Sequence, residues 1–156
     1  AVLDVGAGIG VDARGFADLG HRVVAVEPAD AMRAVAMEDR DHENITWIAD
    51  YLPTLEKVVS LDQTFDFILL SASFMHLSPE YQQTGMTTLG RLTAPNGHVA
   101  MLLRHGPEGR TMYEISDETA LSLGGAAGLA PVIQAHGADP RQRPGVTWSS
   151  FVLEKA

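Results

Sequence analysis

Short apolar runs alternate with helical patterns along this chain, and the alternation constrains the fold more than any other feature. Runs at 1–5, 22–26, 45–49, 67–71 and 99–103 have the length of buried strands. The segments between them carry helix signals, such as Ser78-Pro79 as cap and first residue of a helix that we expect to end near Leu92. Strands that alternate with helices in this way predict βαβ units and a parallel sheet.

Further helices are expected over 12–19, after a cap at Asp30, around 55–59, and from a cap at Ser116 to about 128. The helix after Asp30 should bury Met32, Val35 and Met37. Residues 95–97 read as a turn, and two final strands are expected at 132–136 and 146–153.

The length of 156 residues suits one domain over 1–156. We expect a single α/β domain: a doubly wound, mostly parallel, seven-stranded sheet with helices on both faces. In such sheets ligands bind beyond the carboxyl ends of the strands, where the strand order reverses.

Composition limits the partners. The formal net charge is −9, and the eleven Lys and Arg are scattered apart from a loose group at Arg141 and Arg143, which disfavours nucleic acid as a substrate. No run approaches the length of a membrane span, and nothing resembles a signal peptide. The absence of cysteine excludes disulfides and thiolate metal sites. We therefore expect a cytoplasmic protein that binds neither membrane nor metal.

The turn after the first strand is rich in glycine. It reads Asp4-Val5-Gly6-Ala7-Gly8-Ile9-Gly10, between a strand and a helix. Glycine lets the backbone turn tightly and approach a ligand, and the helix that follows offers free N–H groups. The spacing is G-x-G-x-G rather than the dinucleotide fingerprint, so a generic strand-to-helix turn stays open as an alternative.

Two acidic residues strengthen the case for a ligand. Glu27 ends the second strand, where a carboxylate is placed to accept hydrogen bonds from both hydroxyls of a ribose. Asp50 ends the third strand, where it can accept a hydrogen bond from an adenine amino group. The alternatives are a solvated Glu27 and an Asp50 that caps a helix or turn.

Taken in order, these segments resemble the successive motifs of class I S-adenosylmethionine-dependent methyltransferases. The resemblance rests on 2–10, Glu27, Asp50, the run Phe65-Asp66-Phe67-Ile68-Leu69-Leu70-Ser71, and Arg91 to Val99. Where the family usually has Gly-Gly before the fifth strand, this chain has Asn96-Gly97, a mild departure because Asn tolerates left-handed backbone. The resemblance covers residues 1 to about 153 and favours the small-molecule branch. It also implies helices before the first strand, which are missing from this sequence.

The resemblance implies S-adenosylmethionine as the cofactor and assigns roles to the glycine loop. Gly6, Ala7 and Gly8 would pass under its methionine part, and Asp4 would hold its ammonium group directly or through water. Gly10 completes the set expected of the loop.

Roles for the later strand ends follow from the same resemblance. Glu27 would bind the ribose, Pro28 would lie against one face of the adenine, and Asp50 with the Tyr51 backbone would recognise the adenine edge.

Ser71 and Ala72, at the end of the fourth strand, would lie near the sulfonium. Beyond them, His76 and, after the fifth strand, His105 stand where strand ends should face a substrate, and we expect one of them to act as base. The alternatives are a packing or capping His76 and an ordinary loop histidine at His105. We expect transfer to an oxygen or nitrogen of a small molecule.

Two other functions stay open. A nicotinamide dehydrogenase would need the other glycine spacing, with Gly in place of Val11. A non-catalytic methyltransferase-like domain, which binds the cofactor or serves as a scaffold, would keep the fold without turnover. The sequence does not indicate an oligomeric state.

Overall fold

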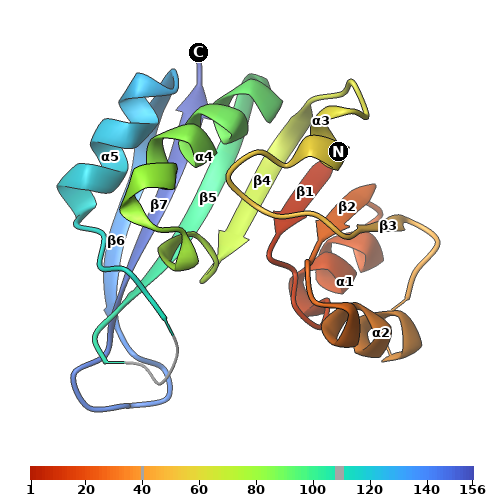
Figure 1. The fold of residues 1–156 in the computed structure, drawn as a ribbon, viewed down its shortest axis with the longest axis horizontal. Coiled ribbons are helices and arrows are strands. Elements are labelled where there is room, and N and C mark those ends of the chain that lie inside the picture. Colours follow the sequence, from red (N-terminus) through yellow and green to blue (C-terminus); the bar gives the residue numbers. More distant parts are fainter. Residues whose placement is uncertain (40, 108–110) are drawn as a thin grey trace.

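The structure, a computed structural model, describes residues 1–39, 41–107 and 111–156. One sheet runs through this part of the chain (Figure 1). Its strands are β1 (Val2–Val5), β2 (Val23–Val26), β3 (Ile45–Ile48), β4 (Phe65–Ser71), β5 (Thr93–His105), β6 (Leu129–Ala138) and β7 (Thr147–Lys155). The helices are α1 (Val11–Asp18), α2 (Asp30–Asp39), α3 (Glu56–Val59), α4 (Pro79–Leu92), α5 (Asp117–Ala126) and the 3-10 helix η1 (Phe74–His76).

The strand order is β3-β2-β1-β4-β5-β7-β6. All neighbours are parallel except β7, which is antiparallel to β5 and to β6. The order reverses between β1 and β4, because the chain winds from β1 outward to β3 and then returns to β4. The predicted seven-stranded, mostly parallel, doubly wound sheet is confirmed, and its switch point lies where the glycine loop leaves β1.

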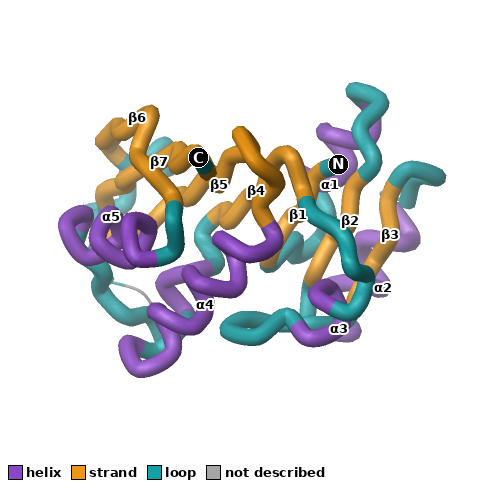
Figure 2. Tube along the Cα trace, turned by 90° about the horizontal axis from the view of Figure 1, so that it is seen from above, coloured by secondary structure: helices purple, strands orange, loops and turns teal. Residues whose placement is uncertain are grey.

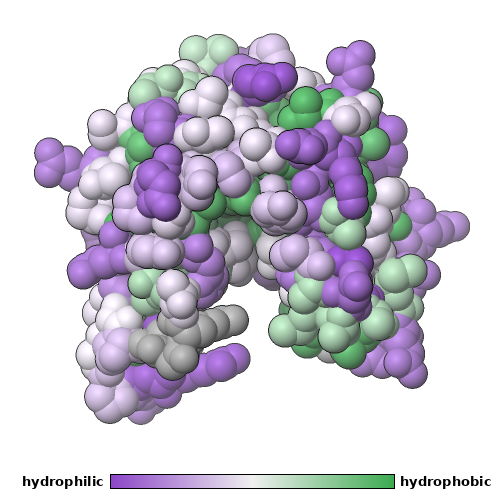
Figure 3. Space-filling model, viewed as in Figure 1, coloured by the Kyte–Doolittle hydropathy of each residue, from purple (hydrophilic) through white to green (hydrophobic). Residues whose placement is uncertain are grey.

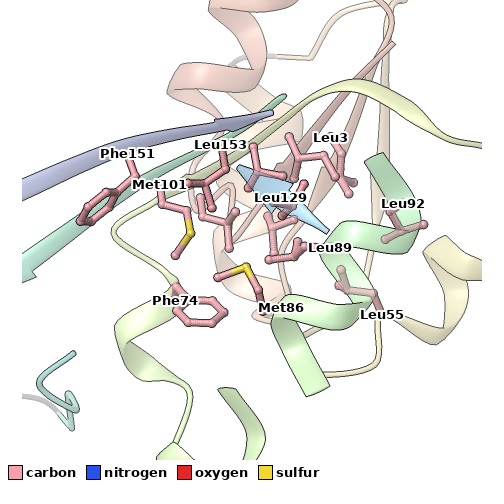
Figure 4. Close-up of a cluster of buried hydrophobic side chains, with 14 of the residues drawn as sticks. Leu3, Leu55, Phe74, Met86, Leu89, Leu92, Met101, Leu129, Phe151 and Leu153 are labelled. Atoms are coloured by element: carbon pink, nitrogen blue, oxygen red, sulfur yellow. The ribbon is translucent and has the colours of Figure 1, made fainter. Parts of the chain in front are cut away.

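The larger part of the core lies between the sheet and α3, α4 and α5 (Figure 4). Alternate strand residues such as Leu3 and Met101 meet Met86 and Leu89 of α4 there, all fully or almost fully buried. In Figure 2 α4 and α5 lie together along one side of the sheet. Each buried leucine or methionine contributes about 1.5–3 kcal/mol, so this face is the principal source of stability.

The opposite face is covered by α1 through a smaller cluster. Ala13 and Ala17 are buried against Val2, Val23 and Ala25, so the helix packs close to the strands through its smallest side chains. Helices therefore cover both faces, as the sequence predicts.

The prediction that α2 buries Met32, Val35 and Met37 is wrong. These side chains are 45%, 42% and 51% exposed, and the buried residue of the helix is Ala36. The reason is position: α2 packs beside the glycine loop and the short edge strand β3, so the small Ala36 makes the close contact. Asp30 is the first residue of the helix rather than its cap, and its carboxylate pairs with Arg33.

Two other local predictions need correction. The turn at 95–97 lies inside β5 as an irregularity in its pairing with β4, and Asn96 adopts a φ of 59° there. Ser78 occupies the cap position of α4 but its side chain makes no capping hydrogen bond, whereas the predicted cap at Ser116 accepts one from Thr119 N.

Among the described residues, no helix combines the length and the apolar character that crossing a membrane requires.

Candidate functional site

A cavity of about 600 Å³ opens at the carboxyl ends of β1, β2 and β4. In the space-filling view the molecule is hollowed below these strand ends (Figure 3). Most of the residues that the sequence singles out line this cavity: Gly6, Gly8, Glu27, Pro28, Asp50, Tyr51, Ser71, Ala72 and His76. Asp4, Ala7, Gly10 and His105 do not line it.

The three glycines of the loop are needed for three different reasons. A Cβ on Gly6 would lie 2.6 Å from the Cβ of Ser73, whose hydroxyl donates a hydrogen bond to the Val5 carbonyl oxygen at 2.7 Å. Gly8 lines the cavity with a φ of +56°, and a Cβ there would meet no protein atom within 4 Å. Gly8 therefore leaves room for a ligand, whereas Gly6 brings β1 and the segment after β4 together.

Gly10 has a structural role. It occupies the cap position before α1 with a φ of 81°, and a Cβ there would lie 2.9 Å from the Trp47 ring of β3 and 3.3 Å from Ala36 Cβ of α2. The close packing of the loop against α2 and β3 is what requires glycine here.

Glu27 joins the glycine loop to the loop after β2. Its Oε2 accepts a hydrogen bond from Gly8 N at 3.0 Å, and its Oε1 accepts one from Ala29 N at 2.9 Å. The side chain is only 9% exposed but lines the cavity. Two bonds use about half of the acceptor capacity of a carboxylate, so lone pairs remain for hydroxyl groups of a ligand.

Asp50 caps a helix and also lines the cavity. Its Oδ2 accepts hydrogen bonds from Lys57 N at 2.8 Å and Val58 N at 3.1 Å, which caps the first turn of α3. Its Oδ1 accepts one from Tyr51 N at 2.9 Å. The same carboxylate lines the cavity, with the exposed Tyr51 beside it.

Asp4 is buried in β1 at 1% exposure, behind the cavity wall rather than in its lining. Burial raises its pKa to about 7, with a further upward contribution from the nearby charge of Asp12. Its Oδ2 has no hydrogen-bond partner among the described residues. A cation bound nearby would stabilise the ionised form of this buried carboxyl.

The end of β4 forms the far wall of the cavity. Ala72 follows Ser71 with a φ of 58°, an unusual conformation for a residue with a Cβ. His76 follows in η1 and is exposed, and its Nδ1 lies 2.7 Å from the Thr111 carbonyl oxygen. A carbonyl oxygen only accepts, so Nδ1 must carry a proton, and Nε2 is the atom of the neutral ring that can take one.

His105 lies away from the cavity. Its ring points to the side of the sheet that α5 covers, where Nε2 is 2.9 Å from Ser149 Oγ. The Ser149 hydroxyl donates to Asp117 Oδ1 at 2.8 Å, so its oxygen is the acceptor for His105. Asp117 also binds His136. This chain of hydrogen bonds joins α5 to β5, β6 and β7.

A second cavity of about 260 Å³ adjoins the first, and Ala72 and His76 line both. Its other lining residues come from η1, from the ends of β5 and β7, and from the loop between β6 and β7: Met75, Arg104, Trp148, Asp139, Pro140, Arg141 and Arg143.

In the sequence, Arg141 and Arg143 form only a loose basic group. The topology explains their place, because β7 is antiparallel to β5 and the loop before it therefore returns to the carboxyl ends of the parallel strands.

No group of three or more His, Asp or Glu side chains in the described part of the chain is arranged to hold a metal ion.

Comparison with known proteins gives consistent results. A model of the methyltransferase-domain family matches residues 2–97. An uncharacterized methyltransferase of Staphylococcus carnosus (strain TM300) is 31% identical over 101 residues, which make up 65% of this chain. The chain spans 45% of that relative's length.

Solved structures match over almost the whole chain. One is Burkholderia thailandensis 1,6-didemethyltoxoflavin-N1-methyltransferase with bound 1,6-didemethyltoxoflavin and S-adenosylhomocysteine, with a TM-score of 0.78 and 25% identity over 99% of this chain and 70% of that one. Another is magnesium protoporphyrin IX methyltransferase from Synechocystis PCC 6803 with bound SAM, with a TM-score of 0.74 over 99% of this chain and 69% of that one. At 16% identity the second match shows the fold alone.

Proposed function

This chain belongs to the methyltransferase-domain family, and we propose on that premise that residues 1–156 bind S-adenosylmethionine and transfer its methyl group to an oxygen or nitrogen of a small molecule. The observation that carries the proposal is the pair of cavities that share Ala72 and His76. The lining of the larger cavity supports a nucleoside site, and the smaller cavity, which adjoins it, would hold the acceptor.

The residues of the larger cavity fit this cofactor. Gly8 leaves open space where a side chain would stand, and Glu27 keeps lone pairs for the ribose hydroxyls. Asp50 would accept from the adenine amino group. Asp4, behind the cavity wall, would hold the ammonium group directly or through water with its Oδ2, which has no partner among the described residues. Pro28 and Tyr51 supply surface for the adenine ring.

When bound, S-adenosylmethionine supplies an electrophilic methyl group and leaves as the neutral thioether S-adenosylhomocysteine. The task of the chain is to position the acceptor and to remove its proton. Nε2 of His76 takes the proton that the acceptor O–H or N–H loses. The bond from Nδ1 to the Thr111 carbonyl oxygen orients the ring and fixes the tautomer that leaves Nε2 basic.

His105 has no catalytic role in this proposal, because its ring is bonded to Ser149 on the side of the sheet that α5 covers, away from the cavity. A small acceptor is supported by the volume of about 260 Å³ beside Ala72, since a cavity of about 150 Å³ already holds a benzene ring. The net charge of −9 argues against nucleic acid.

The test is formation of S-adenosylhomocysteine from S-adenosylmethionine with a panel of small phenols, ring N–H compounds and amines, and with DNA and RNA in physiological salt. Two variants separate the roles of His76. His76→Asn keeps an amide N–H close to the position of Nδ1 but has no Nε2, whereas His76→Ala loses both.

If His76 is the base, both variants should lower kcat about 10²-fold or more, with cofactor affinity within a few-fold of the parent. Turnover retained by His76→Asn but lost in His76→Ala would make His76 a positioning residue. Methylation of DNA or RNA in preference to every small molecule would refute the small-molecule acceptor.

A further inference from the structure

We propose that the smaller cavity selects an anionic, planar acceptor: an aromatic or heteroaromatic carboxylate whose hydroxyl or ring N–H is methylated. The proposal rests on the function proposed above and names the class of substrate for the same site. It is carried by Arg141 and Trp148, which line the same cavity as Ala72 and His76 but come from the hairpin of β6 and β7.

The lining of this cavity is positive in an acidic protein. Among the described lining residues there are three arginines, Arg104, Arg141 and Arg143, and one carboxylate, Asp139, which pairs with Arg143. The whole chain carries −9. A cleft of opposite sign to the rest of the molecule concentrates field lines and attracts small anions.

The carboxylate of Asp139 is fully hydrogen-bonded within the chain. Its Oδ2 accepts from Arg143 Nε at 2.8 Å and Arg143 N at 3.0 Å, and its Oδ1 accepts from Arg143 Nη2 at 2.8 Å and Trp148 Nε1 at 3.0 Å. Four hydrogen bonds fill the acceptor capacity of a carboxylate. Asp139 therefore holds Arg143 and Trp148 in place and does not compete as an acceptor for a proton on the substrate.

Arg141 is the cation that this arrangement leaves for a ligand. It is exposed at the cavity, and no carboxylate of the described residues pairs with it. Arg104, a buried residue, adds a second guanidinium, whose Nη2 donates to the Pro107 carbonyl oxygen at 2.7 Å. A guanidinium is the side chain best shaped to bind a carboxylate through two parallel bonds.

Trp148 gives the preference for a planar compound. Its indole nitrogen is tied to Asp139, so the ring is fixed at the cavity wall, where an aromatic acceptor can stack on it. The volume of about 260 Å³ suits one substituted ring. A ring whose carboxylate binds Arg141 would direct its other end toward Ala72 and His76, which line the same cavity and where the proton would be removed.

The test is calorimetric titration of the protein, first with S-adenosylhomocysteine and then, when it is saturated, with 4-hydroxybenzoate or with the uncharged 4-hydroxybenzamide. The acid should bind about 10-fold more tightly than the amide, and the difference should shrink as salt is added. Arg141→Gln should weaken binding of the acid about 3- to 10-fold and leave the amide unchanged. Trp148→Leu should weaken both compounds to a similar degree.

Arg91→Gln is the matched control, because it removes the same charge from the exposed surface of α4, outside both cavities, and should change neither affinity. Failure of S-adenosylhomocysteine to bind would refute the proposed function and this inference with it. Binding of S-adenosylhomocysteine together with equal affinity for acid and amide, no binding of either compound, or an acid preference that survives Arg141→Gln would overturn the anion preference alone.

Discussion

Replacing Asp4 by Asn should remove a large part of the dependence of folding stability on pH in the ligand-free protein. Burial raises the pKa of Asp4 from 3.8 to about 7. A carboxyl group whose pKa is higher in the folded state binds its proton more tightly there. It therefore contributes stability that is present at low pH and is lost as pH rises from the unfolded value toward and through the folded value.

The size of the effect follows from the two pKa values. Between about pH 5 and pH 8 the unfolded chain has already lost this proton, whereas the folded chain keeps it until about pH 7. At 1.36 kcal/mol for each pKa unit, the free energy of unfolding should fall by about 2–3 kcal/mol across this range because of Asp4 alone. For a domain of this size that corresponds to roughly 2–4 °C of Tm for each kcal/mol.

The assay is urea unfolding of the parent and of Asp4→Asn at about pH 5 and pH 8. The change in the free energy of unfolding between the two pH values is compared between the two proteins, so that the contributions of other titrating groups cancel. Asp12→Asn should reduce the slope in part, since the charge of Asp12 contributes to the shift. Glu43→Gln, an exposed carboxylate in the loop before β3, is the control and should leave the slope unchanged. Equal pH dependence in the parent and Asp4→Asn would refute the reasoning.

Three other expectations follow from the site and the fold. Glu27→Gln should weaken binding of S-adenosylhomocysteine by about 2–3 kcal/mol in calorimetry and also lower the free energy of unfolding by about 1 kcal/mol, because Gly8 N and Ala29 N both use its carboxylate; unchanged affinity would contradict the pocket assignment. Gly8→Ala and Gly10→Ala share the cost of a positive φ, but Gly10→Ala should lose about 1–3 kcal/mol more in urea unfolding, because its Cβ would meet the Trp47 ring. Burial raises the pKa of Asp117, but hydrogen bonds from His136 and Ser149 together lower it more, so its folded-state pKa lies below the unfolded value near 4. The stability that Asp117 contributes is therefore present above the unfolded pKa and is lost as pH falls through the folded pKa. Asp117→Asn should accordingly flatten the fall in the free energy of unfolding at acid pH.

The fold could be predicted because its signals are repeated along the chain. The parallel strands β1, β2 and β4 lie in short apolar runs, and a parallel sheet buried on both faces requires such runs. The position of Glu27 and Asp50 at strand ends follows from the same pattern, which is why both were predicted to reach the cavity.

Helix α2 shows where this reasoning stops. The spacing of Met32 and Val35 is that of a buried face, but spacing does not reveal whether a neighbouring element covers the face. At the edge of the sheet the buried residue of this helix is the small Ala36, which packs near Gly10. The exposed apolar residues of α2 are therefore a consequence of its place in the sheet rather than of its sequence.

The glycine loop and the smaller cavity depend on neighbours that are distant in sequence. Nothing within the loop distinguishes Gly8, which faces the cavity, from Gly10, which packs on Trp47. Likewise, the role of Arg141 depends on the hairpin of β6 and β7, which returns the loop to the ends of the parallel strands (Figure 1).

The measurement that tests the central claim most directly is calorimetric titration of the chain with S-adenosylhomocysteine and, separately, with NAD. We expect one site for each chain with a Kd of about 1–100 µM, weakened in Glu27→Gln, and no heat of binding with NAD. Clear binding of NAD without binding of either S-adenosylmethionine or S-adenosylhomocysteine would contradict the assignment of the larger cavity.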